Sequence, residues 1–508
     1  MIYINGDNLS FSDFNNVVYK KEKINITPET EERIESAYKF VDRIVKSNRI
    51  VYGISTGFGK LVDVKIQDKD IDKLQMNLIL SHASGIGKPL AGDFVRGAIL
   101  LRLNVIAKGF SGVRIETFNL LKELLNRNII PVVPEKGSVG ASGDLAPLAH
   151  IALTLLGRGE VYYNGQIVPS MEALKDTGLL PVKLKAKEGL ALINGTQVMT
   201  SIGLSAFLKA ENLSRNADVI GAFSVEAFRG IHYAFDEQVV NLRPYPGAKK
   251  TIKNFNLLFK DSKVWDEVRK ENRVQDPYSI RCIPQVHGAY KDALKYISDT
   301  LNIEINSVTD NPLLFPETDD IISGGNFHGE PVAFVMDMLA ISSAEIANIS
   351  ERRIAKFMDH SFTNLPPFLA ASEGLNSGFM IAQVAAASLV SENKILAHPA
   401  SVDSIPTSDN QEDHVSMGTI AARKAYEVVE NSLNVIAIEA LCAAQAVDFQ
   451  KPQDLPKPLL AVYRKIREKV SYMEKDRELY KDITLIKELI DNKDLLESIR
   501  QDVGKIEV

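Results

Sequence analysis

Residues 137–150, GSVGASGDLAPLAH, carry the least ordinary chemistry that this sequence offers, because Ala141, Ser142 and Gly143 lie among turn-forming residues. In a tight turn the amide nitrogen of Gly143, whose own residue has no side chain, can attack the carbonyl carbon of Ala141 and close a five-membered ring with loss of water. Loss of the Ser142 hydroxyl as a second water leaves an exocyclic methylidene on an imidazolone. None of the twenty side chains supplies such a carbon electrophile, so the pattern predicts a reaction that needs one.

Eight further sequence blocks bear on this triplet, which by itself is typical of an ordinary turn. They are YGISTGFG at 52–59, NLILSHASGIG at 77–87, INGTQ at 193–197, QDPYSIRC at 275–282, NSVTDNPLLF at 306–315, GGNFHGEP at 324–331, LNSGFMIAQVAAA at 375–387 and HPASVDSIPTSDNQEDHVSMG at 398–418. With the triplet, they resemble the ammonia-lyases that carry the prosthetic group 4-methylideneimidazole-5-one (MIO). The resemblance implies that Ala141, Ser142 and Gly143 form MIO autocatalytically and that no external cofactor is required.

The implied reaction removes ammonia from an α-amino acid, which requires loss of a weakly acidic β-proton and departure of a poor leaving group. A methylidene carbon activates the substrate by bonding either its amine or its ring, and the sequence leaves both routes open. By the resemblance, Tyr52 occupies the base position of the family. A tyrosine that acts as a base needs a pKa lowered from about 10. Helix N-termini and the guanidinium of Arg281 would lower this pKa.

Further positions match the family's pocket, although each residue alone would be read as structural. Arg281 matches the arginine that holds the substrate carboxylate, for which a bidentate guanidinium is well shaped. Tyr278 and Asn194 match positions that line the prosthetic group, and Tyr278 is expected among the catalytic residues. The remaining matches to the substrate pocket are Gln275, Phe327 and Met380.

Ser81, His82 and Glu412 bear on the choice of substrate. Family members that act on phenylalanine or tyrosine carry Phe-Leu or His-Leu where this chain has Ser81 and His82, and usually glutamine in place of Glu412. An imidazole and a carboxylate suit a polar, ionisable substrate ring. Together with these residues, the resemblance implies deamination of L-histidine to trans-urocanate and ammonia, the first step of histidine catabolism. A tyrosine or phenylalanine lyase or an aminomutase shares the electrophile and remains the alternative.

Other classes of protein are disfavoured. The related aspartase/fumarase group, which works without MIO, carries a GSxxMPxKxN loop that is absent here, and residues 140–143 do not fit the GxSxG pattern of serine hydrolases. The segment GISTGFGK at 53–60 has the wrong spacing for a phosphate loop, and Leu61 replaces the required Ser or Thr. A catalytically inactive helical scaffold is expected to have lost the triplet, Tyr52 or Arg281, and all are present.

Composition favours a cytoplasmic protein that acts on a small molecule. The 508-residue chain has a net charge of −6 and no block rich in Lys or Arg, so neither nucleic acid nor an anionic membrane is an expected partner. Its eight histidines show no HExxH or comparable spacing, and Cys282 and Cys442 form no ligand pair, which predicts that there is no metal site. The first residues lack the basic and apolar regions of a secretory signal.

Hydrophobic periodicity predicts a mainly α fold. Thr27, Pro28 and Glu29 favour a helix start, with Ile34, Ala37, Val41 and Ile44 on one face. Short strands are predicted in the first third, at the N-terminus, at IVYGI (50–54) and within EVYYNGQIV (160–168). Long helical segments are predicted at 196–228, 331–357, 375–396 and 415–448, and a buried helix is expected over 374–391.

Domain organisation and assembly follow from the resemblance. It implies a long helical bundle of aspartase/fumarase-like architecture at 111–508, which carries the triplet near its start, after a smaller mixed globular part at 1–110. The active sites of the family are built from several subunits, and the helices within 375–448 are strongly apolar. We therefore expect a homotetramer with dihedral symmetry.

Overall fold

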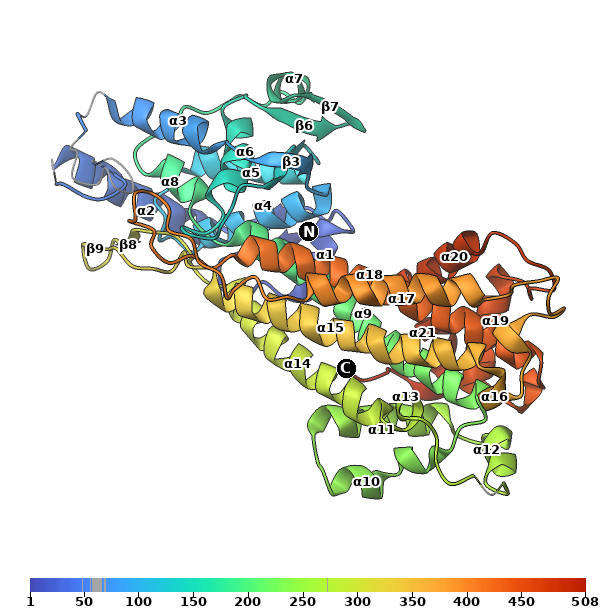
Figure 1. The fold of residues 1–508 in the computed structure, drawn as a ribbon. Coiled ribbons are helices and arrows are strands. Elements are labelled where there is room, and N and C mark those ends of the chain that lie inside the picture. Colours follow the sequence, from blue (N-terminus) through green and yellow to red (C-terminus); the bar gives the residue numbers. More distant parts are fainter. Residues whose placement is uncertain (48, 55, 57–65, 68–69, 272) are drawn as a thin grey trace. The chain divides into compact units, whose positions relative to one another are not determined.

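A computed structural model describes residues 1–47, 49–54, 56, 66–67, 70–271 and 273–508 (Figure 1). The chain divides into two compact units. The first unit comprises residues 1–205, 299–336 and 399–423, and the second comprises 206–298, 337–398 and 424–508. The predicted mainly α fold is confirmed, because long helices dominate the described chain. The boundary proposed near residue 110 stays a prediction.

The first unit combines short helices with small sheets. Its helices are α1 (Phe11–Val18), α2 (Pro28–Lys46), α3 (Ile71–His82), α4 (Gly92–Ala107), α5 (Ile115–Asn126), α6 (Leu145–Leu155), α7 (Ser170–Asp176) and α8 (Glu188–Ile193). Strand β1 (Ile2–Tyr3) pairs in parallel with β2 (Ile24–Asn25). The antiparallel pairings join β3 (Ile86–Pro89) to β5 (Pro134–Lys136), β6 (Glu160–Tyr163) to both β4 (Ile130–Pro131) and β7 (Gln166–Pro169), and β8 (Leu313–Phe315) to β9 (Asp320–Ile322).

Local sequence signals predicted some of these elements correctly and predicted one strand that the structure does not contain. Helix α2 begins as expected, with the Thr27 side chain accepting a hydrogen bond from the Thr30 amide, and the four apolar residues predicted for one face are buried. Strands β6 and β7 confirm the strands predicted within residues 160–168, and they pair with each other as an antiparallel hairpin. The strand predicted at 50–54 is wrong, because residues 52–54 form a turn in which Gly53 has a φ of +71°. Glycine adopts this left-handed conformation readily, which suits it to the turn that begins at Tyr52.

Four long helices run from one unit into the other: α9 (Gln197–Ala227), α14 (Ile283–Glu304), α15 (Glu330–Met358) and α18 (Gly418–Asp448). The other helices of the second unit are α10 (Glu237–Asn241), α11 (Pro246–Leu258), α12 (Lys263–Val268), α13 (Tyr278–Arg281), α16 (His360–Thr363), α17 (Met380–Leu396), α19 (Lys457–Lys469), α20 (Leu479–Asp491) and α21 (Asp494–Val503). Short 3-10 helices occupy His232–Phe235, Pro367–Leu369 and Pro452–Asp454. The long helices confirm the predicted bundle.

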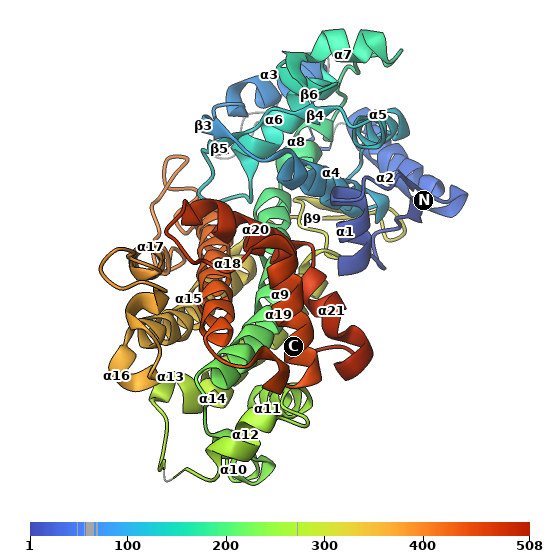
Figure 2. The ribbon, with the colours of Figure 1, turned by 90° about the vertical axis from the view of Figure 1, so that its right-hand side faces the viewer.

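A buried ion pair joins three of the long helices inside the second unit. Glu439 of α18 accepts hydrogen bonds from Arg353 of α15, at 2.5 and 2.8 Å, and from Ser224 of α9, at 2.6 Å. Both charged side chains are fully buried, and α15 and α18 run side by side here (Figures 1 and 2). Since a buried charge is costly unless it is paired and hydrogen-bonded, this network favours one register of the helices.

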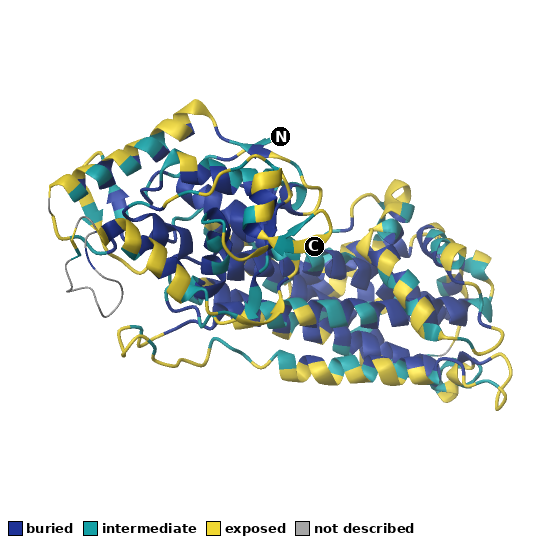
Figure 3. Cartoon of the chain, turned by 90° about the horizontal axis from the view of Figure 1, so that it is seen from above, coloured by how far each residue is buried: buried dark blue, intermediate teal, exposed yellow. Residues whose placement is uncertain are grey.

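Buried residues gather on the inner faces of the helices and exposed residues on their outer faces (Figure 3). Helices α15 and α17 differ in how their apolar residues are covered. By length and composition, α15 is the one described helix that could cross a membrane, but 67% of its most apolar window is buried within the protein. It also carries Arg353, whose buried charge is paired with Glu439 inside the protein. The buried helix predicted over 374–391 is wrong for this chain, since α17 begins only at Met380 and its Ile381 and Val384 are 62% and 52% exposed. Apolar composition predicted burial, but the chain itself does not cover this face.

Candidate active site

The triplet Ala141-Ser142-Gly143 lies in a turn directly before α6. Gly143 has a φ of +69°, and a Cβ added to it would lie 2.1 Å from the carbonyl oxygen of Gly195. The Gly195 amide donates to the Ser142 carbonyl at 3.3 Å, and the Asp144 amide donates to the Gly195 carbonyl at 2.7 Å. Backbone conformation and close approach therefore both require glycine at position 143. This turn fits formation of MIO, because ring closure needs an unhindered backbone nitrogen at residue 143.

Asp144 holds three segments of the chain around the triplet. Its carboxylate accepts the amides of Val198 and Met199, at 2.9 and 2.8 Å, in the first turn of α9. It also accepts the hydroxyls of Ser138 and Thr419. Burial raises the pKa of Asp144, while these hydrogen bonds act in the opposite direction. The residue thus caps one helix and fixes the turn that contains Ser142.

Three helices of the first unit begin beside the triplet. Helix α6 follows it directly, Asp144 caps α9, and the segment leading into α18 is bound to residues 139 and 140. In that segment the Met417 amide donates to the Val139 carbonyl at 2.9 Å, and the Ser416 hydroxyl donates to the Gly140 carbonyl at 3.1 Å. Because helix N-termini carry partial positive charge, they stabilise negative charge at this place. The N-termini of α6, α9 and α18 thus gather at the triplet.

A cavity of about 920 Å³ lies beside the triplet, within the first unit. Seven predicted site residues line it: Tyr52, His82, Ala141, Ser142, Asn194, Phe327 and Glu412. Ser81 and Gly143 line an adjoining hollow of about 370 Å³, which shares His82, Ser142 and Glu412 with the cavity. Tertiary structure thus brings together residues that are far apart in the sequence. Several lining residues were not predicted, among them Leu78, Leu190, Asn311, His328 and His414.

Glu412 is bound to the residue expected to become the electrophile. The Ser142 hydroxyl donates to Oε1 of Glu412 at 3.1 Å. The other carboxylate oxygen accepts the hydroxyls of Thr407 and Ser408, at 2.7 and 2.8 Å. These contacts orient the carboxylate at the cavity wall beside Ser142. A polar substrate ring in the cavity would therefore meet a positioned acceptor.

His82, at the end of α3, is a second acceptor in the same wall. Its Nδ1 lies 2.9 Å from the Leu78 carbonyl, which can only accept, so Nδ1 carries a proton. Burial lowers the pKa of His82, while the Leu78 hydrogen bond and the charge of Glu412 act in the opposite direction. Because a lowered pKa favours the neutral ring, Nε2 keeps its lone pair for an N–H donor.

Asn194 connects the cavity to a buried arginine that was not predicted. Its side-chain nitrogen donates to the Asn311 carbonyl at 3.2 Å, and its Oδ1 has no hydrogen-bond partner among the described residues. The Asn194 backbone carbonyl accepts from Arg102 at 2.7 Å. Burial lowers the pKa of Arg102 to about 10, so it remains cationic near neutral pH. A charged residue inside the apolar run of α4 was the signal that could have identified it.

Four predicted site residues belong to the second unit, so the structure does not place them in this cavity: Gln275, Tyr278, Arg281 and Met380. Tyr278 is 71% exposed, and the guanidinium carbon of Arg281 lies 4.5 Å from the centre of its ring. Nε of Arg281 donates to the Asp276 carbonyl at 3.0 Å. The described residues that line the cavity include no Lys or Arg, so a substrate carboxylate needs a partner from elsewhere.

A sequence profile of the aromatic amino acid lyase family matches residues 9–468. The chain belongs to that family. The predicted enzyme class, a carbon–nitrogen lyase, is thereby confirmed. A histidine ammonia-lyase from Natranaerobius thermophilus is 48% identical over 507 residues, which is 100% of both chains.

Two solved structures resemble this lyase closely in fold. The histidine ammonia-lyase from Trypanosoma cruzi is 40% identical, with a TM-score of 0.92 and coverage of 99% of this chain and 95% of that one. The tyrosine aminomutase from Streptomyces globisporus is 34% identical, with a TM-score of 0.94 and full coverage of both chains. Because proteins named for different reactions match almost equally well, the fold alone does not distinguish these activities.

Proposed function

We propose that this lyase converts L-histidine to trans-urocanate and ammonia, with MIO formed from Ala141, Ser142 and Gly143 as its electrophile. The observation that carries this proposal is the position of His82 and Glu412 in the same cavity wall as Ser142. Hydrogen-bond acceptors suit the ring of histidine, which carries one N–H group when neutral and two when protonated and needs partners for them once it leaves water. The curated relatives named histidine ammonia-lyase support the same substrate.

The residues of the chain then have separate roles. MIO, once formed, supplies a carbon electrophile that the amine or the ring of the substrate can bond. Tyr52, in the cavity wall, takes the proton from the β-carbon of the substrate. Asn194 and Phe327 border the reacting atoms, and Arg281, Tyr278, Gln275 and Met380 complete the pocket from a second copy of the chain. Arg281 holds the substrate carboxylate.

Formation of the prosthetic group is tested by mass. We expect the intact protein to be lighter than its sequence by two waters, because ring closure and dehydration of Ser142 each release one. Mass spectrometry of the peptide that spans residues 137–150 locates the loss. Ser142→Ala keeps the backbone but has no side-chain hydroxyl to lose. Its mass should therefore fall by one water at most. A full-mass peptide from the wild type would refute MIO formation.

The alternative is an MIO lyase or aminomutase that acts on tyrosine or phenylalanine. The similarity to a tyrosine aminomutase structure keeps this reading open. It predicts an apolar or phenol-binding wall where this chain has His82 and Glu412. Incubation with histidine, tyrosine and phenylalanine, with absorbance detection of each conjugated acid, distinguishes the two proposals.

We further infer a cytoplasmic homotetramer with dihedral symmetry. The exposed apolar residues of α17 are suited to burial between subunits, and Leu375, just before this helix, is 85% exposed. The location of Arg281 and Tyr278 outside the unit that holds the cavity agrees with sites shared between chains. In this arrangement one chain supplies the triplet and another supplies the carboxylate partner.

Shared sites make a prediction about mixed variants. Ser142→Ala and Arg281→Ala should each have little activity alone, but subunits mixed after reversible dissociation should regain roughly a quarter of the wild-type activity. A random mixture pairs an intact Ser142 with an intact Arg281 at about one site in four. Light scattering establishes the assembly before and after mixing. A fully active monomer, or mixed subunits with no recovered activity, would contradict shared sites.

A further inference from the structure

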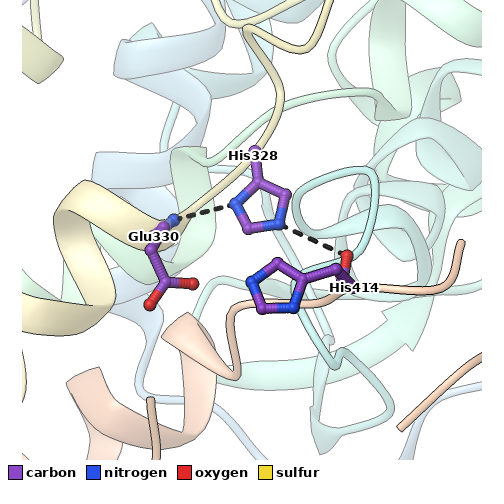
Figure 4. Close-up of side chains that lie close together, drawn as sticks. All are labelled: His328, Glu330 and His414. Atoms are coloured by element: carbon purple, nitrogen blue, oxygen red, sulfur yellow. Dashed lines mark hydrogen bonds between the residues drawn. The ribbon is translucent and has the colours of Figure 1, made fainter. Parts of the chain in front are cut away.

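Three side chains suited to a metal ion lie together in the first unit: His328, Glu330 and His414 (Figure 4). One ring nitrogen of each histidine and one carboxylate oxygen of Glu330 lie within 4.8 Å of one another. Both histidines also line the cavity that contains Ser142. The sequence analysis found no metal spacing because His414 is 86 residues beyond His328. The fold brings the two segments together.

His328 already has an arrangement that coordinating histidines commonly show. Its Nε2 lies 3.3 Å from the His414 carbonyl, and since a carbonyl oxygen only accepts, Nε2 carries the proton. Nδ1 therefore holds the lone pair, which accepts the Glu330 amide at 3.3 Å and would exchange this hydrogen bond for the ion. A metal-bound histidine usually donates its second ring N–H to a carboxylate or backbone carbonyl, which fixes the plane of the ring. The contact from Nε2 supplies this orientation.

The second histidine and the carboxylate complete a mixed ligand set. The rings of His328 and His414 are nearly parallel, with an interplanar angle of 5° and centroids 5.5 Å apart. Figure 4 shows the Glu330 carboxylate beside the His414 ring. Ligand atoms about 2.1 Å from a tetrahedral ion lie roughly 3.4 Å from each other, so side-chain rotations that bring the atoms up to about 1.4 Å closer place this group in range.

Charge also favours a cation at this place. Glu412 and Asp413 line the same cavity, and the described lining residues include no Lys or Arg. Helix α15 begins at Glu330, and the partial positive charge of its N-terminus disfavours binding of a cation. The negative charge of Glu330 offsets that effect, so Glu330 is the ligand on which affinity depends most.

We propose that His328, Glu330 and His414 bind one divalent transition-metal ion of the Zn²⁺ or Co²⁺ type. Two imidazoles and one carboxylate are a ligand set that such ions accept, with a fourth position left for water or substrate. Since His328 and His414 line the substrate cavity, that position is accessible to a molecule bound there. Mg²⁺ and Ca²⁺ prefer oxygen ligands and are not expected to compete.

Titration with Co²⁺ tests the site directly. Tag-free protein dialysed against a chelator should take up one Co²⁺ per chain, with visible absorption bands and a Kd on the order of 10 µM or lower. Zn²⁺ should displace the bands and Mg²⁺ should not. Glu330→Gln and His414→Ala should each lower the affinity at least about tenfold. His360→Ala removes an exposed histidine in α16 and is the matched control, with wild-type affinity expected.

Three outcomes would overturn the proposal. They are no Co²⁺ bands up to about 1 mM ion, a Glu330→Gln variant that binds as tightly as the wild type, and equal loss of binding in the His360→Ala control. Circular dichroism of each variant establishes that it is folded, and replacement of His414 is mild because its side chain is exposed. The readout is binding, so the result is independent of whether the lyase acts on histidine.

Discussion

Ser142→Ala is expected to give a folded protein that has lost at least roughly a thousandfold of its kcat on histidine. The substitution keeps the backbone and Cβ and removes the hydroxyl whose loss creates the methylidene. In the uncyclised chain, the side-chain hydrogen bond that the described residues give to Ser142 is the 3.1 Å bond to Glu412, so stability should change little. Absorbance of the conjugated product measures kcat, and thermal unfolding monitors the fold.

Two controls accompany this variant. Ser498→Ala removes a serine hydroxyl in α21, where it donates to the Leu495 carbonyl, and should keep wild-type activity. Borohydride should inactivate the wild type by reducing the exocyclic carbon, with a matching change in mass. Retention of most activity in Ser142→Ala would show that catalysis does not depend on an electrophile at this residue.

Selectivity among amino acids is expected to depend on His82 and Glu412. Phenylalanine should be a very poor substrate of the wild type, by on the order of 10⁴-fold in kcat/KM, because its ring leaves both polar groups unpaired. His82→Leu, especially together with Ser81→His, should depress histidine turnover and raise tyrosine deamination. Glu412→Gln should mainly impair histidine turnover, because Gln keeps the shape and loses the charge. Steady-state kinetics on all three amino acids measure these changes.

The selectivity prediction has a matched control variant, and two outcomes would contradict it. His360→Leu replaces an exposed histidine of the second unit and should leave the ratio of histidine to tyrosine turnover unchanged. If the wild type preferred tyrosine, or if His82→Leu kept full efficiency with histidine, the assignment of imidazole recognition would be wrong. The loss of two waters would still show that MIO forms, so the two failures are distinguishable.

Elements with local signals were predictable, and elements that depend on partners were not. Helix α2 follows from its Thr27 cap, Pro28 and a periodic apolar face, all within one short segment. The expected strand at 50–54 failed because strands need a neighbour and Gly53 turns the chain. The burial expected for α17 failed because apolar composition does not state whether the same chain covers it.

The sequence by itself identified the triplet predicted to cyclise and the candidate recognition residues, because the chemistry expected of Ala141-Ser142-Gly143 is local and His82 and Glu412 lie in recognisable blocks. Only the tertiary structure decided which distant groups meet. Ser142 contacts Glu412 across 270 positions, Asp144 caps α9, and His414 lies beside His328. Such contacts depend on which elements pack together, and local propensity does not encode that arrangement. For the same reason, the acidic lining of the cavity and its lack of Lys or Arg became visible only in the folded chain.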